Sequence, residues 1–231
     1  GGDVWEYQSI AVNFAKGHGF PVFGGIEPFA TYKFGREQEK DQTRADIYRR
    51  FHKGPLVGKK VFYRTPGYIL FLGLIYKYGD ISPLAVKRIQ LKCYAAIAAL
   101  LPLVGFIYWR WHGALAGVIS GSVFLDYFYW LSTFIMVENG SAICVMLIIL
   151  AFILWEKRTT VITSIILGIV IGLSFLVKGA FLFLVPILGF YFFLLYRKRK
   201  ITIRHVLAVL MACFFTILPW SWYATMSSKQ L

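Results

Sequence analysis

The first residues of this chain carry two acids in a pattern suited to activating a hydroxyl group. Asp3 and Glu6 stand three positions apart in Asp3-Val-Trp-Glu6. This spacing fits a capping box, in which Asp3 accepts a hydrogen bond at a helix start and Glu6 reaches back to the backbone. It also fits a general base, because one carboxylate suffices to take a proton from an acceptor hydroxyl when the leaving group is a phosphate. Both interpretations stay open, since a cap would also fix the side chain of a base.

Two further acids lie beside long apolar stretches. Glu138 follows Met-Val and precedes Asn-Gly-Ser, at the expected start of a helix, where the helix dipole favours an acid. The alternative is that Glu138 binds a metal or a sugar hydroxyl at the membrane rim. Asp126 stands in an aromatic run, and a carboxylate at that depth needs a partner or a water-filled cavity. A functional group and a buried structural pair therefore both stay open for Asp126.

Four basic residues are candidates for holding an anionic phosphate. Arg64 precedes Thr-Pro-Gly-Tyr, Lys178 lies in a turn between two apolar stretches, and Lys87 and Arg88 stand near the start of another. Arg offers a fork of donors to a phosphate and Lys offers a point charge. The alternative is that each side chain extends to the lipid headgroups. The sequence leaves both interpretations open.

The rest of the chain consists largely of apolar stretches that predict membrane-spanning helices. With 58% hydrophobic and 18% aromatic residues, the chain is too apolar for an ordinary soluble domain. The net charge of +14 does not predict nucleic-acid binding, because the basic residues form no single polar face and many stand at the ends of apolar runs. About six stretches have the length of a membrane span: 84–109, 113–132, 137–155, 161–177, 180–196 and 203–222.

Basic clusters at alternate ends of these stretches predict the orientation of the chain. If the clusters at 110–112, 156–158 and 197–204 are cytoplasmic, residues 1–65 form an extracytoplasmic loop that contains short helices, one at 3–15 and another at 36–51. Lys87 and Arg88 then stand on the outer side, against the rule. Residues 66–79 are too short for a span and predict an interfacial helix.

The predicted fold class is therefore an all-α polytopic membrane protein. A multi-span helical bundle at 80–223 follows the outer loop, and residues 224–231 begin a further outer loop. Because the chain opens on Gly-Gly and ends just beyond a span, we expect a fragment that lacks an N-terminal span and a C-terminal portion.

Several short segments, in their order along the chain, resemble membrane glycosyltransferases of the GT-C superfamily. The segments are Gly2–Tyr7 with Gly17–Phe20, Arg64–Phe71, Ala85–Gln90, Leu173–Lys178 and Leu218–Trp220. They are most similar to those of the dolichyl-phosphate-mannose protein mannosyltransferases and aminoarabinose transferases. Two departures concern the family's Thr-Glu-Pro segment, which reads Val-Glu-Asn here, and the residue after Lys178, which is Gly179 where the family often has Pro.

The resemblance implies an inverting glycosyltransferase that uses a polyprenyl-phosphate sugar donor. Asp3 takes the place of the catalytic acid, Glu138 that of a second acid, and Lys178 that of a basic residue before a turn. The acceptor would be a lipid, a glycan or a protein at the outer face of the plasma (inner) membrane. No cofactor is certain, and a divalent metal with Glu6 or Glu138 as partial ligands stays open.

Two other classes of function compete with a transferase. A flippase or transporter of lipid-linked substrates predicts charges buried within the spans and helices broken near the midplane. A non-catalytic membrane scaffold predicts that Asp3→Asn leaves function unchanged.

Overall fold

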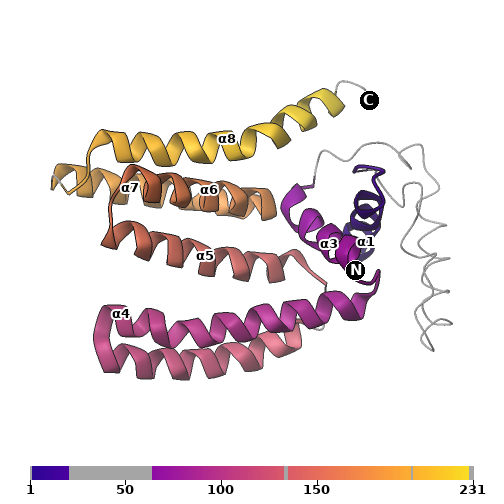
Figure 1. Ribbon diagram of the computed structural model, residues 1–231, viewed down its shortest axis with the longest axis horizontal. Helices are drawn as coiled ribbons and strands as arrows, with labels where there is room; N and C mark the ends of the chain where they lie inside the picture. Colours follow the sequence, from indigo (N-terminus) through magenta and orange to yellow (C-terminus); the bar gives the residue numbers. More distant parts are fainter. Residues whose placement is uncertain (1, 21–63, 133–134, 199, 229–231) are drawn as a thin grey trace.

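The computed structural model describes residues 2–20, 64–132, 135–198 and 200–228, and its described residues form helices without any strand. Five of the described α-helices lie side by side along the long axis, and two short ones pack across one end of this bundle (Figure 1). The short helices are α1 (Gly2–Ala15) and α3 (Pro66–Tyr78). The bundle consists of α4 (Pro83–Ser132), α5 (Val137–Lys157), α6 (Val161–Val177), α7 (Leu184–Arg197) and α8 (Ile203–Ser228).

The two short helices share a hydrophobic core at the end of the bundle. Ile10 and Ala11 of α1 are fully buried against Ile69 and Leu72 of α3. The predicted helix at 3–15 is confirmed. It ends just before Gly17, which has a φ of +83° that side-chain-bearing residues rarely adopt. The helix expected at 66–79 forms as α3, but several of its apolar side chains are buried against protein.

The two spans predicted at 84–109 and 113–132 form one hairpin, α4, with a tighter connection than the predicted turn at 110–112. Only Trp109 and Arg110 leave helical geometry, and Arg110 takes a φ of +53°. The two arms of α4 are so close together that a Cβ on Gly105 would lie 2.0 Å from the carbonyl oxygen of Gly113. Ser82 caps the start of α4, since its Oγ accepts a hydrogen bond of 3.2 Å from the backbone N–H of Leu84.

The last two predicted spans differ from the observed helices at their ends. The stretch 180–196 begins with a 3-10 helix, η3 (Gly179–Phe183), before α7 starts at Leu184. Helix α8 continues past the predicted end at 222 to Ser228, through Pro219, so much of the loop predicted at 224–231 is helical. The loop at 21–63, including the helix predicted at 36–51, lies outside the described residues.

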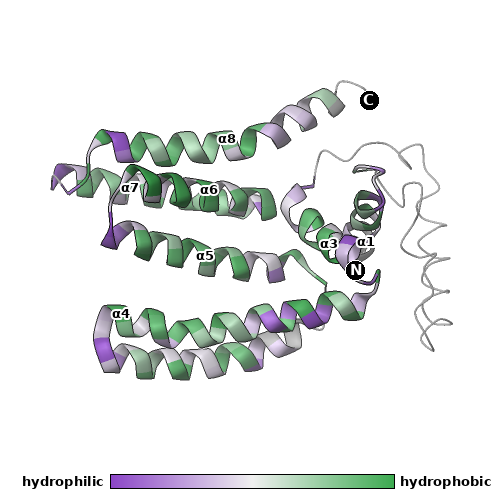
Figure 2. Cartoon of the chain, in the orientation of Figure 1, coloured by the Kyte–Doolittle hydropathy of each residue, from purple (hydrophilic) through white to green (hydrophobic). Residues whose placement is uncertain are grey.

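The helices of the bundle have the length and composition of membrane spans. Four described helical segments are long and apolar enough to cross a membrane, namely Pro83–Tyr127, Val137–Lys157, Gly179–Arg197 and Ile203–Met226, and Val161–Val177 is a shorter apolar helix. Their outward faces are apolar (Figure 2): Leu147 is 47% exposed, for example, and Phe214 is 55% exposed. A surface of this kind needs hydrocarbon around it, so the chain is a membrane protein.

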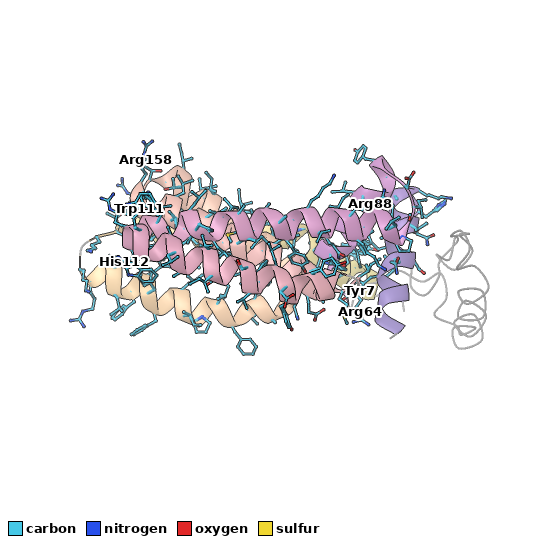
Figure 3. The ribbon with its side chains drawn as sticks, turned by 90° about the horizontal axis from the view of Figure 1, so that it is seen from below. Tyr7, Arg64, Arg88, Trp111, His112 and Arg158 are labelled. Carbon is cyan, nitrogen blue, oxygen red and sulfur yellow. The ribbon has the colours of Figure 1, made fainter. Side chains whose placement is uncertain are left out.

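The basic clusters gather at one end of the bundle, as predicted from their alternation along the chain. Trp111, His112 and Arg158 lie at this end, and Tyr7, Arg64 and Arg88 lie at the opposite end (Figure 3). Helices α1 and α3 thus cover the end that is remote from the basic clusters.

Helix α6 packs against α8 at a glycine. This contact predicts that one methyl group added to that glycine lowers the stability of the fold. A Cβ on Gly168 would lie 2.3 Å from the carbonyl oxygen of Val209. Helix propensity alone favours Ala over Gly by about 1 kcal/mol, but this overlap is with backbone and cannot be relieved by a side-chain rotation. We expect Gly168→Ala to lower the free energy of unfolding in detergent by about 1–3 kcal/mol.

The matched control is Gly189→Ala in α7. A Cβ at Gly189 meets no atom within 4 Å, so this variant should be as stable as the wild type or slightly more stable. Equal stability of the two variants would contradict the α6–α8 contact.

Candidate functional site

Two of the four cations predicted to hold a phosphate, Arg64 and Lys178, lie beside one junction between helices. The Thr65 hydroxyl donates a hydrogen bond of 2.9 Å to the carbonyl oxygen of Val177, across 112 positions of sequence. At the same junction Gly67 lies against backbone, since its Cβ would be 2.7 Å from the carbonyl carbon of Leu176. Arg64 directly precedes Thr65 and Lys178 directly follows Val177, so the start of α3 and the end of α6 place both cations at one end of the bundle.

Lys178 forms an ion pair with Glu138. The distance from Lys178 Nζ to Glu138 Oε1 is 3.0 Å, and the two side chains are 37% and 45% exposed. Glu138 lies in the first turn of α5, as predicted, and Lys178 caps the C-terminus of α6. A pair exposed to this extent contributes about 0–1 kcal/mol to stability. It can therefore open readily when a phosphate competes for the lysine.

A network of buried polar side chains lies between the helices at this end. Gln90 Nε2 donates a hydrogen bond of 2.9 Å to the Tyr68 hydroxyl, and the Tyr94 hydroxyl donates one to Asn139 Oδ1. These contacts join α3, α4 and α5, and Asn139 is the neighbour of Glu138. The Oε1 atom of Gln90 is buried and has no hydrogen-bond partner among the described residues.

No role for these buried polar side chains was predicted from the sequence. Gln90 lies in one of the segments that carry the resemblance, and Gln90 and Tyr94 stand four positions apart on one helix face. The spacing of these two polar residues in an apolar helix is the feature from which a buried polar contact could have been predicted.

Two buried phenols of α3, those of Tyr68 and Tyr76, act as hydrogen-bonding groups. Burial raises the pKa of Tyr68 well above its usual range, although its hydrogen bond with Gln90 opposes this shift. Burial also raises the pKa of Tyr76, whose hydroxyl donates a hydrogen bond of 3.2 Å to Gln8 Oε1 in α1. Neither phenol is therefore a base near neutral pH, and both serve to attach α3 to its neighbours.

Helix α1 contacts the junction through Tyr7. The Arg64 guanidinium carbon lies 5.3 Å from the centre of the Tyr7 ring, and this ring meets the Tyr68 ring edge-on at 5.5 Å. These contacts hold α1 beside Arg64, one of the predicted phosphate-binding cations (Figure 3). Asp3 and Glu6 belong to α1, but their side chains lie outside the described part of the structure.

The other predicted site residues are less closely grouped. Lys87 is half-buried and Arg88 is exposed near the start of α4, and among the described residues neither forms an ion pair with Glu138. Asp126 is exposed on the second arm of α4, so the buried structural pair considered for it is not found. The described residues contain no group of three or more potential metal ligands, and the metal hypothesis involving Glu6 extends beyond them.

Comparison of this chain with family models, with curated proteins and with solved structures finds no significant match. The similarity to GT-C glycosyltransferases therefore stays a prediction that rests on short sequence segments.

The buried network predicts a cost for removing one hydroxyl group. In Tyr68→Phe the buried amide N–H of Gln90 loses its acceptor, and we expect the free energy of unfolding to fall by about 1–3 kcal/mol. The double variant Tyr68→Phe/Gln90→Leu should recover part of this loss, because it removes both polar partners. Detergent-denaturation curves of the purified variants measure both effects.

Tyr78→Phe serves as the control, because Tyr78 is 80% exposed at the end of α3. If Tyr68→Phe proved as stable as this control, the hydrogen-bonded network would not contribute to the fold.

Proposed function

We propose that this protein is an inverting glycosyltransferase that transfers a sugar from a polyprenyl-phosphate donor to an acceptor at the extracytoplasmic face of the membrane. The observation that carries the proposal is the Thr65–Val177 hydrogen bond of 2.9 Å, which brings Arg64 and Lys178 to one end of an apolar bundle. A polyprenyl-phosphate sugar has a membrane-embedded tail and an anionic head. Apolar helices capped by cations at one end suit both parts of such a donor.

The cations have a defined task in this reaction. When the bond between the anomeric carbon and the phosphate oxygen breaks, the electron pair leaves with the phosphate, and nearby cations stabilise the charge that develops. Lys178 starts this step paired with Glu138 at 3.0 Å. Glu138 holds the lysine in place before the donor arrives and balances its charge after the product leaves.

The acceptor hydroxyl needs a base. Asp3 takes its proton as the acceptor oxygen forms its bond to the anomeric carbon from the face opposite the phosphate, which inverts the configuration. Support for this role comes from α1, which carries Asp3 and packs on α3 beside Arg64. The acceptor is a lipid, a glycan or a protein of the cell envelope.

The charge distribution supports the proposed side of the reaction. The clusters containing His112 and Arg158 lie at the end of the bundle opposite Arg64 (Figure 3). Clusters of Lys and Arg favour the cytoplasmic side of a membrane. The end with Arg64 and Lys178 is therefore assigned to the extracytoplasmic side of the plasma (inner) membrane.

A transfer assay tests the proposed chemistry. The full-length protein in liposomes is given radiolabelled polyprenyl-phosphate hexose or pentose and an envelope extract as the acceptor. We expect Asp3→Asn to reduce the transfer rate about 10²–10⁴-fold, the usual contribution of a positioned base. Asp80→Asn is the control, because Asp80 is exposed in the connection between α3 and α4.

Transfer that is undiminished in Asp3→Asn would remove Asp3 as the base. Movement of the labelled lipid between leaflets by the wild type, without transfer to any acceptor, would instead identify a flippase.

Labelling from one side of the membrane tests the orientation. Cysteines are introduced one at a time at Asp80 and Thr202, two exposed positions at opposite ends of the bundle, in a protein lacking its natural cysteines. We expect a membrane-impermeant maleimide added outside intact cells to label the Asp80→Cys variant and to leave the Thr202→Cys variant unlabelled until the cells are lysed. Labelling of both from outside would contradict the assigned topology.

A further inference from the structure

A half-enclosed apolar cavity lies between α6, α7 and α8, away from the candidate site. Its volume is about 290 Å³, and its walls include Phe175, Leu188, Phe192, Val206 and Cys213. No charged side chain contributes to its lining. A cavity of this composition excludes polar ligands and accepts hydrocarbon.

One glycine keeps this cavity open. Gly189 of α7 belongs to the lining, and a Cβ built on it would meet no atom within 4 Å. Neighbouring residues of α7 anchor the helix by ring contacts instead: Phe192 lies 5.4 Å from Trp155, and Tyr191 lies 5.4 Å from Phe152. The aromatic contacts hold α7 to the bundle while the glycine leaves space beside it.

The length of the cavity matches one leaflet of a bilayer. Its lining along α7 runs from Val185 to Tyr196, which corresponds to roughly 16 Å at about 1.5 Å per residue. The hydrocarbon core of a bilayer is about 30 Å thick, so one leaflet accounts for about 15 Å. An acyl chain that entered at Tyr196 would reach the far end of the cavity near the bilayer midplane.

Cations lie close in the chain to one end of the cavity, here called its mouth. Tyr196 and Ile203 line the cavity at this end, which carries the basic clusters, and each is directly followed by an arginine, Arg197 and Arg204. Four exposed cations lie here: Arg197, Lys198, Lys200 and Arg204. None of them forms an ion pair with an acid in the part of the chain that the structure describes.

We propose that this cavity is a binding site for an anionic phospholipid, with one acyl chain between α7 and α8 and the phosphate held by the four described cations Arg197, Lys198, Lys200 and Arg204. Charge complementarity favours this occupant over a further transmembrane helix, because an apolar helix would leave the cations at the mouth without a counter-charge. The site lies at the end of the bundle opposite the proposed transferase site. The two proposals are therefore independent, and either can fail alone.

Lipid retention tests the proposal. The full-length protein, delipidated in detergent, is titrated with dioleoyl phosphatidylglycerol or dioleoyl phosphatidylcholine, and bound lipids are counted by native mass spectrometry. We expect one phosphatidylglycerol to remain bound at concentrations at which phosphatidylcholine is lost. Gly189→Phe should weaken this binding at least about tenfold, because its ring fills the space beside Gly189; a tenfold loss corresponds to about 1.4 kcal/mol.

Ile187→Phe is the control for added bulk, because Ile187 is 63% exposed on the same helix and lies outside the cavity lining. Gly189→Leu is a second, smaller obstruction, and the melting temperature of each variant shows whether it is folded. Retention that is unchanged in folded Gly189→Phe and Gly189→Leu would overturn the proposed cavity.

The headgroup is tested by replacing Arg197, Lys198, Lys200 and Arg204 with Gln together. A Lys or Arg near a membrane surface attracts an anionic lipid by about 1 kcal/mol, so the preference for phosphatidylglycerol should fall at least about tenfold. Arg110→Gln/Arg158→Gln, at the same end of the bundle, should retain it. Equal binding of both phospholipids by the wild type, displacement of phosphatidylglycerol by equimolar polyprenyl phosphate, or a second copy of the chain at the cavity would overturn the assignment.

Discussion

The close contact between the start of α3 and the end of α6 is the constraint on which the proposed site depends. Gly67 lies so near the backbone of Leu176 that any Cβ would come within 2.7 Å of it. The Thr65–Val177 hydrogen bond fixes the direction in which the chain enters this contact. These backbone positions thereby bring Arg64 and Lys178 to the same end of the bundle, where Arg64 lies against the Tyr7 ring and Lys178 pairs with Glu138.

Different forces stabilise the end formed by α1 and α3 and the helical bundle. Around α1 and α3, buried apolar side chains such as Ile10 and Leu72 form a core like that of a soluble protein. Along the bundle the apolar side chains face outward, where lipid provides no hydrophobic driving force between helices. Close backbone contact at Gly105 and Gly168, and hydrogen bonds such as Trp155–Ser164 at 2.9 Å, supply the specificity there.

Most of the helices could be predicted from composition, whereas their ends and partners could not. The turn within α4 needs only Trp109 and Arg110, because the glycines of its arms permit a close approach that hydropathy does not encode. The observed start of α7 and the observed end of α8 also differ from the predicted ones, since apolar composition does not distinguish a 3-10 turn from an α-helix and does not fix where a helix ends. The alternation of basic clusters did predict that Glu138 and Lys178 would lie at one end, but not that they would pair.

By itself, the sequence determined the all-helical membrane class, because span length is a local property of the chain. It also determined which charged residues lie at the same end of the bundle, because charge alternation is local as well. Only the tertiary structure decided which polar groups meet: the Glu138–Lys178 pair, the Tyr68–Gln90 hydrogen bond and the cavity beside Gly189. These depend on the rotation and the spacing of helices that are far apart in sequence. Rotation and spacing are set by side-chain volumes at several contacts together, and no single segment specifies them.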